Sequence, residues 1–364
     1  MRKDILRKGL VFMTICFLMY AAVLPHIITN VEADLGDVVY EIPSPGYGTS
    51  GLTWDGNYLW SDNSVLDKIF KIDPMDGAII NSYDSPGDGA RGLTWDGTYL
   101  WNSDTDVDKI FKLNPSDCSI VDSFDSPGDD PRDLCWDGTY LWNANAHNSK
   151  IYKLNPSDGS IIFSFDSPTS SPLGLAWDGI KIWSSSSVSQ KIYAHNPSDG
   201  NVIVSFDSPG NAPCGLACEE NYLWNIDMLD DKIYKIDINE PPNTPTIEGP
   251  TSGNWLLSHQ WNFTASDPNG DDIFYYVEWG DGEYIGWSLA YNSGETMPRS
   301  HKYNAKGTYT IQVKAKDIYG LESEWGYLTV TMPCSYNIPM QWFWDRLFQK
   351  FPNVFPILRH LMGY

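Results

Sequence analysis

Tryptophan recurs in this chain at an interval of 41 residues. One column of the repeat consists of Trp54, Trp95, Trp136 and Trp177, with Cys218 in the fifth position. A second column consists of Trp60, Trp101, Trp142, Trp183 and Trp224. Five copies of one unit predict a repeat architecture in which each unit buries its apolar face against its neighbours. Because both columns recur in nearly every copy, we interpret the tryptophans as packing residues and not as sugar-binding platforms.

Each copy has the pattern of four short strands. In the second copy, Asp96-Gly97 forms a two-residue turn, which glycine favours because it accepts a positive φ. A polar loop is expected at residues 102–108. The predicted strands are residues 91–95, 99–101, 109–113 and 119–125. Four antiparallel strands in 41 residues is the size of a propeller blade.

The fifth copy lacks a fourth strand. Its third strand, at residues 232–237, runs directly into a proline-rich linker. Residues 38–45 align with residues 79–86 at the same spacing of 41. We therefore predict an all-β fold in which residues 34–239 form a five-bladed β-propeller. An N-terminal strand would complete the last blade and leave no open edge.

The first 33 residues have the pattern of a signal peptide. Basic residues precede an apolar run at 9–24, and Val31-Glu32-Ala33 offers small residues for cleavage. Cleavage would leave a chain that starts near Asp34. The alternative is an uncleaved anchor, although the run is shorter than the ~20 residues of a full membrane span. Either predicts a protein that is secreted or held at the cell surface.

Charge and cysteine content narrow the partners. The formal net charge is −23, which opposes binding to nucleic acid. An acidic surface suits calcium or cationic ligands, and solubility alone would also explain it. The cysteines that follow the signal peptide form no CxxC pair, so no zinc site is indicated. Free, mostly buried thiols are expected at Cys118, Cys135, Cys214, Cys218 and Cys334.

A propeller site is expected where the copies differ. The residues directly before the repeated Gly-Leu step are Ser50, Arg91, Arg132, Leu173 and Cys214. Arg91 and Arg132 could bind a carboxylate or phosphate near the axis, or pair with acids such as Asp130. The rim loops add Asp104, Asp106 and His147 as ligand-binding candidates, and we expect their acids to form a solvated rim. No catalytic motif stands out from the repeat.

The amino-acid sequence of the repeat resembles that of a known group of propellers. The segment Gly92-Leu93-Thr94-Trp95-Asp96-Gly97, followed by Thr98-Tyr99-Leu100-Trp101, resembles the secreted prokaryotic propellers of the virginiamycin-lyase and YncE-like groups. It covers residues 34–238. The five-blade count also resembles plant-type glutaminyl cyclases and certain glycosidases, in architecture alone. Neither resemblance confers an activity.

Residues 240–333 predict a second domain. Alternating segments read as the strands of a β-sandwich. The motifs Val277-Glu278-Trp279-Gly280-Asp281-Gly282, His301-x-Tyr303 and Gly307-x-Tyr309 resemble a PKD domain. The resemblance implies an immunoglobulin-like extracellular module that acts as a spacer or binding unit. In some members calcium is bound, and the matching residues here are Asn243, Asp271, Asp272 and Asp317. Acids at turns without a metal are the alternative, and Asn262 begins a glycosylation sequon.

Residues 334–364 form a third kind of segment. Trp342, Phe343 and Trp344 begin an apolar face on an expected short amphipathic helix, and the tail has more basic than acidic residues. The tail resembles terminal segments of exported archaeal PKD proteins. Contact with a membrane surface, a sorting signal or docking onto the chain's own domains would each bury that face.

Two functions remain open. The first is an extracellular or cell-surface binding or adhesion protein that uses the propeller as a rigid platform for protein or carbohydrate. The PKD domain would then be a spacer. The second is a secreted enzyme of lyase, cyclotransferase or glycosidase type with its site at the propeller rim, where Arg91 and Arg132 would orient an anionic group.

Overall fold

The computed structural model describes residues 35–333, 346–347 and 349–350. Strands dominate this part of the chain, and helix occurs in it only at residues 346–347 and 349–350, so the all-β prediction is confirmed. The predicted signal peptide and nearly all of the predicted tail lie outside the described residues. Within the described ranges, no helix has the length and apolar character needed to cross a membrane.

Five four-stranded antiparallel sheets follow one another along the first two thirds of the chain. The first contains β2 (Thr49–Trp54), β3 (Leu59–Asn63), β4 (Lys68–Ile72) and β5 (Ile79–Asp84). The second contains β6 (Ala90–Trp95), β7 (Leu100–Asp104), β8 (Lys109–Leu113) and β9 (Ile120–Asp125). The third contains β10 (Pro131–Trp136), β11 (Leu141–Asn145), β12 (Lys150–Leu154) and β13 (Ile161–Asp166). The fourth contains β14 (Leu175–Trp177), β15 (Ile182–Ser186), β16 (Lys191–His195) and β17 (Val202–Asp207). The fifth joins β18 (Pro213–Glu219), β19 (Tyr222–Asp227) and β20 (Lys232–Asp237) to β1 (Val38–Pro43).

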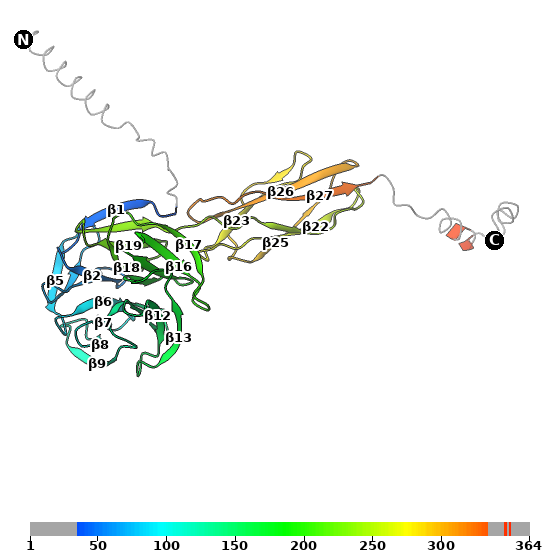
Figure 1. The fold of residues 1–364 in the computed structure, drawn as a ribbon. Helices are drawn as coiled ribbons and strands as arrows, with labels where there is room; N and C mark the ends of the chain where they lie inside the picture. The colour runs from blue at the N-terminus through cyan, green and yellow to red at the C-terminus, as the bar shows by residue number, and fades with distance from the viewer. Residues whose placement is uncertain (1–34, 334–345, 348, 351–364) are drawn as a thin grey trace, which may run out of the picture. The chain divides into compact units, whose positions relative to one another are not determined.

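The five sheets form a closed ring. The first strand of each sheet contacts the first strand of the next, and β18 contacts β2. In Figure 1, β2, β6 and β18 lie toward the middle of the ring, with β5, β9 and β13 on its perimeter. The inner strands approach closely: a Cβ atom on Gly51 would lie 2.7 Å from the Cα atom of Gly92. Glycine at this column therefore permits the close approach of neighbouring sheets.

The N-terminal strand closes the ring as predicted. β1 pairs antiparallel with β20, with Ile42 opposite Ile233. The Lys232 ammonium lies 2.7 Å from a carboxylate oxygen of Glu41. The other sheets have the same ion pair between their third and fourth strands, as in Lys68 and Asp84. Strand β1 thus takes the place of the missing fourth strand of the fifth sheet. It pairs with the third strand and supplies the same ion pair as the fourth strands of the other sheets.

The tryptophans of the second column are buried between neighbouring sheets, and polar contacts fix their positions. Its five members are at most 2% exposed. The indole N–H of Trp60 donates to the turn carboxylate of Asp55 at 2.7 Å, and Lys71 donates to the same oxygen at 3.1 Å. The Lys71 ammonium also lies over the rings of Tyr58 and Trp60. The turn acids are therefore part of the packing as well as of the turn.

The fourth sheet departs from this arrangement. Lys181 occupies the tyrosine position of the repeat, and Ala194 occupies the lysine position. Lys181 is buried, and its ammonium lies 2.5 Å from Glu240, at the start of the linker. In this sheet the lysine therefore lies directly before the second strand and not on the third, and it binds a carboxylate outside the repeat.

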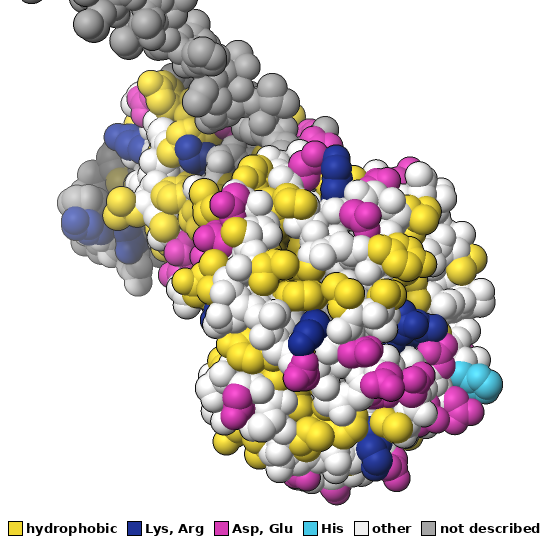
Figure 2. Space-filling model, turned by 90° about the vertical axis from the view of Figure 1, so that its left-hand side faces the viewer, with side chains coloured by type: hydrophobic (Ala, Val, Ile, Leu, Met, Phe, Trp, Pro, Cys, Tyr) yellow, Lys and Arg dark blue, Asp and Glu magenta, His cyan; other side chains and the backbone are white. Residues whose placement is uncertain are grey.

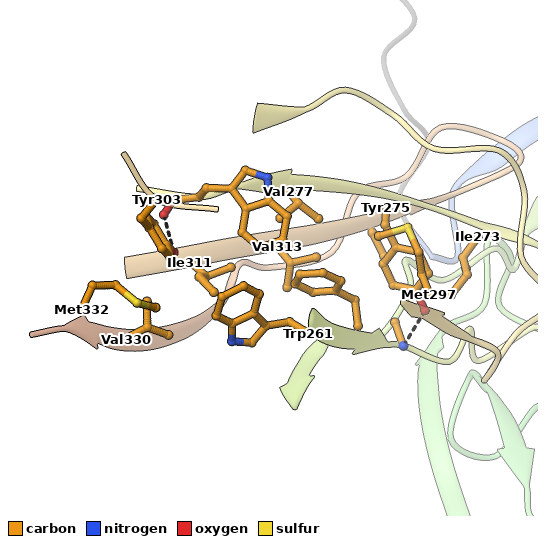
Figure 3. Close-up of a cluster of buried hydrophobic side chains, with 14 residues drawn as sticks. Trp261, Ile273, Tyr275, Val277, Met297, Tyr303, Ile311, Val313, Val330 and Met332 are labelled. Atoms are coloured by element: carbon orange, nitrogen blue, oxygen red, sulfur yellow. Dashed lines mark hydrogen bonds between the residues drawn. The ribbon is translucent and has the colours of Figure 1, made fainter. Parts of the chain in front are cut away.

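The second domain has two sheets. One contains β21 (Thr246–Glu248), β22 (His259–Thr264) and β25 (Thr296–His301). The other contains β24 (Tyr284–Ile285), β23 (Ile273–Glu278), β26 (Gly307–Asp317) and β27 (Gly326–Met332). Alternate side chains of both sheets meet in one core, which includes Trp261, Tyr275 and Val313 (Figure 3). The Tyr303 hydroxyl in this core donates to the carbonyl of Trp279 at 3.1 Å.

Candidate functional site

The five positions that precede the Gly-Leu step meet at one place. Ser50, Arg91, Arg132, Leu173 and Cys214 line a single cavity of about 30 Å³, together with Met228. The cavity lies where the inner strands begin, at one end of the ring. The positions that differ between the copies therefore line one cavity. Each of the five similar sheets contributes one side chain to it, and these side chains differ in type.

Arg91 is the cation of this cavity that lacks an ion-pair partner among the described residues. Its Nε atom is buried and has no hydrogen-bond acceptor there. The Arg91 charge acts to lower the pKa of Asp62, against the larger opposite effect of burial, without forming an ion pair with it. A partly buried guanidinium without an acceptor is suited to bind a carboxylate or another small anion.

Arg132 pairs with a neighbouring acid, which was the alternative to ligand binding in the sequence analysis. Its guanidinium donates from Nη2 to Asp130 at 3.0 Å, and its Nε lies 2.9 Å from the other oxygen of the same carboxylate. Both groups are partly exposed, so the pair contributes little net stability. Arg132 thus lines the cavity with its charge already matched.

The expected solvated acidic rim is wrong for Asp104, which is fully buried, as are Asp62 and Asp227 of other copies. The second strands run longer than predicted, and β7 extends to Asp104. These carboxylates bind main-chain N–H groups: Asp62 accepts from Gly51 at 2.8 Å, and Asp104 accepts from Asp106 at 2.8 Å. Burial raises the pKa of Asp62, while the bonds from Gly51 and Ser50 lower it. Asp104 therefore holds its own loop, and Asp62 joins β3 to β2.

The exposed candidates lie at loop tips. Asp106 and His147 are both exposed. The described residues offer no hydrogen-bond or ionic partner to the His147 ring. Figure 2 shows acidic side chains scattered among apolar ones on the surface of the ring that faces the viewer. Asp106 and His147 remain candidates for the edge of a site and do not line the cavity at Arg91.

Asp133 is a central residue that the sequence argument missed. It occupies the glycine column, which otherwise consists of Gly51, Gly92, Gly174 and Gly215. Its Oδ1 accepts the N–H groups of Leu93 and Leu134 at 3.1 and 2.9 Å. Its Oδ2 accepts those of Leu175 and Leu216 at 3.0 and 3.2 Å. The break in the glycine column was the available signal.

One carboxylate therefore joins four of the five inner strands. Burial raises the pKa of Asp133 well above its ordinary value, and the four N–H donors act against that rise. Asp133 lies between the Arg91 cavity and a second cavity of about 120 Å³. The residues after the Gly-Leu step line the second cavity, including Trp54, Trp95, Trp136 and Trp177.

The thiol at the Arg91 cavity is not activated. Burial raises the pKa of Cys214 well above its ordinary value, and the charges of Asp133, Asp227 and Asp62 raise it further. Its Sγ atom lies 3.4 Å from the carbonyl oxygen of Ile226. A nucleophilic cysteine needs the opposite environment, in which a nearby cation favours the thiolate.

The four calcium candidates are not gathered into a ligand set. Among the described residues, no group of three or more His, Cys, Asp or Glu side chains could hold a metal ion. The Asn243 amide donates to Ser266 at 3.1 Å, and Asp272 is exposed. Asp317 accepts three main-chain N–H groups on Oδ1 and the Asn239 amide on Oδ2. Asp271 has a pKa raised mainly by burial.

The predicted glycosylation residue lies on a strand. Asn262 is on β22, opposite Pro298 of β25, and its amide oxygen lies 3.4 Å from the Gln260 amide nitrogen. It is partly exposed.

Known proteins resemble parts of this chain. A PKD domain of an M14-like peptidase from a Thermoplasmatales archaeon is 51% identical; the match covers 26% of this chain and 99% of that chain, with a TM-score of 0.26. Glutaminyl cyclase of Myxococcus xanthus is 14% identical, with 55% of this chain and 95% of that chain covered and a TM-score of 0.50. Virginiamycin B lyase from Staphylococcus aureus is 20% identical, with 54% and 82% covered and a TM-score of 0.38.

No family model matches the chain, and no curated protein matches it. The likeness to the Myxococcus structure supports a β-propeller fold in this chain. The propeller likeness, at 14% identity, concerns the fold and carries no activity with it.

Proposed function

We propose that this chain is a binding protein of the cell surface or the extracellular space. In this proposal the ring is a five-bladed β-propeller that acts as a rigid platform, and the second domain is an immunoglobulin-like PKD β-sandwich. The ligand is a protein or carbohydrate that presents a carboxylate to the Arg91 cavity. The apolar N-terminal segment supports export, and the terminal tail would attach the protein to a membrane surface or a sorting partner.

One observation carries the proposal. Five positions that break the repeat converge on one cavity, where the Arg91 guanidinium has a buried Nε without an acceptor. A repeat protein places its function at such positions because the blades themselves are held constant by packing. The neighbouring Asp130 neutralises Arg132, so Arg91 supplies the charge for the ligand.

The alternative, a secreted enzyme with its site at the rim, has less support. The cavity is small, and its thiol, Cys214, has a raised pKa. Its hydroxyl, Ser50, donates to the buried carboxylate of Asp62 at 2.7 Å. A hydrolase or lyase needs an acid, base or nucleophile that faces the substrate, and the described lining of this cavity offers an arginine instead.

Peptide and glycan arrays test the proposal with the chain that lacks residues 1–33. We expect the wild type to retain ligands with a free carboxylate and Arg91→Ala to lose them. Arg299→Ala in the second domain is the matched control, because among the described residues this guanidinium has a single hydrogen bond, to the carbonyl of Pro298. Equal retention by wild type and Arg91→Ala would refute the site, and turnover of a retained ligand would favour the enzyme.

A further inference from the structure

The outer face of one sheet in the second domain carries an unusual set of side chains. In β23, Ile273, Tyr275 and Val277 point into the core, and the residues between them point away from it. These outward residues are Phe274, Tyr276 and Glu278. On the neighbouring β26, Lys316 lies opposite Phe274 and Lys314 lies opposite Tyr276. Aromatic and charged residues thus alternate across this face.

Tyr276 is the centre of an aromatic cluster. Its ring stacks on Tyr284, with centroids 5.9 Å apart and planes at 19°. The rings of Trp287 and Trp325 lie 5.5 and 6.0 Å from it. Tyr284 is 65% exposed, and Tyr327 of the adjacent strand is 62% exposed. We call Tyr276, Tyr284, Trp287 and Trp325 the aromatic face.

The aromatic face is separate from the core of the domain. The core cluster and the partly buried residues packed against it include none of the four rings. The rings are instead held by one another and by lysine. The Lys314 ammonium lies 5.2 to 5.8 Å from the rings of Tyr276, Trp287 and Trp325. A set of rings fixed in this way loses little conformational entropy when a ligand stacks on it.

The charges on this face are balanced. Lys314 forms an ion pair with Glu322. Lys316 has its ammonium 4.5 Å from the Trp287 ring centroid, and Glu278 is the remaining outward carboxylate of β23. Two lysines and two glutamates give no net charge, on a chain with a net charge of −23. An anionic polymer or lipid would be repelled by the whole chain, and a cation would find the rings already occupied by lysine.

We propose that the aromatic face binds a neutral polysaccharide. A pyranose ring has an apolar C–H face that stacks on an aromatic ring, and hydroxyl groups around its edge. The exposed Tyr284 ring and the partly exposed rings of Trp287 and Trp325 supply the stacking surface. The phenol groups of Tyr284 and Tyr327 with the Glu278 carboxylate supply donors and acceptors. This site is independent of the Arg91 cavity and makes the second domain a ligand-binding domain in its own right.

Affinity electrophoresis tests this with the chain that lacks residues 1–33, in gels that contain a soluble β-glucan, mannan, xylan or glycol chitin. At least one of these neutral polymers is expected to retard the wild type. Trp287→Ala and Tyr284→Ala should each weaken that retardation about tenfold, which is the scale of losing one stacking ring. Tyr284→Phe, which keeps the ring, should retain most of it.

Tyr47→Ala is the control, because Tyr47 is an equally exposed tyrosine of the ring and should leave retardation unchanged. Thermal melts establish that each variant is folded, and Tyr284→Ala, at an exposed position, keeps the test valid if Trp287→Ala does not fold. The proposal is overturned if none of the four polymers retards the wild type, if the alanine variants behave as the wild type, or if only a carboxylated polymer such as alginate is bound.

Discussion

The Asp133 carboxylate accepts a hydrogen bond at 3.2 Å from the main-chain N–H of Leu216, two sheets further around the ring. With its three other N–H donors, Asp133 connects β6, β10, β14 and β18 at the axis. A ring of sheets is otherwise held together by contacts between neighbours. This side chain adds contacts between sheets that do not follow one another.

Replacing Asp133 with the glycine of the other copies should destabilise the ring. Four buried N–H groups would lose their acceptor, and each unsatisfied group costs about 1–3 kcal/mol. Water from the adjoining cavities can replace part of this, so we expect a loss of about 3 kcal/mol or more in the free energy of unfolding. Urea unfolding measures it. Asp133→Asn, which keeps one acceptor oxygen, should lose less, and a glycine variant as stable as the wild type would contradict the role of Asp133.

The different position of the lysine in the fourth sheet, Lys181, predicts that a double substitution restores stability where a single one lowers it. Lys181→Met leaves the Glu240 carboxylate unpaired, and Glu240→Gln leaves a lysine that is 2% exposed without its counter-charge. Removing one partner of a buried pair costs about 3–5 kcal/mol, so Glu240→Gln should be the more destabilising change. The double variant Lys181→Tyr plus Ala194→Lys restores the residues of the other sheets and should recover stability. Chemical denaturation of this double variant and of Lys181→Tyr and Ala194→Lys alone decides this, and simple additivity of the two single changes would count against the exchange.

His195 predicts a dependence of ring stability on acid. Burial lowers its pKa to about 4, whereas the unfolded chain has a value near 6.5. The unfolded state therefore binds the proton first, and stability falls as the pH drops from about 6.5 to 4, by at most ~3 kcal/mol. His195→Leu, which restores the aliphatic residue of the other copies, should flatten this slope. Melting temperatures of both proteins at pH 7 and pH 4.5 measure it, and equal slopes would exclude His195 as the cause.

Asp267 predicts the opposite slope in the second domain. Burial raises its pKa to about 6, and the charges of Asp271 and Asp317 add to the rise. Its Oδ2 is buried without a partner among the described residues. The folded domain holds the proton to a higher pH than the unfolded chain does, so stability falls as the pH rises from about 4 to 6, by up to ~3 kcal/mol. Asp267→Asn should remove this loss and be the more stable protein at pH 7 in calorimetry. A variant less stable than the wild type at that pH would refute it.

The repeat made much of the ring predictable. The column of Trp60 and its equivalents, the Asp-Gly turns and the alignment of residues 38–45 required only a fixed period and turn chemistry. The cavity at Arg91 was also within reach, because the repeat places equivalent residues around one axis. The burial of Asp62 and Asp104 could not be predicted. A polar residue that follows an apolar strand is typical of a loop, and only its hydrogen bonds show that it is buried.

In the second domain, the aromatic face could be predicted from the sequence only in part. Alternation in residues 273–278 separates Phe274 and Tyr276 from the core side chains. Trp287 and Trp325 lie outside the strands, so no period links them to Tyr276. Only the folded chain brings them together with Lys314.

The pairing of β1 with β20 sets an order of events for the nascent protein. The first strand of the ring to leave the ribosome has its partner in the last, about 190 residues later, as the contact of Glu41 with Lys232 records. Four sheets can assemble from contiguous chain, but the fifth cannot form until nearly the whole ring has been delivered. The unpaired edge of β20 would be the final one to be covered. Folding of this ring therefore ends by joining its oldest segment to its youngest.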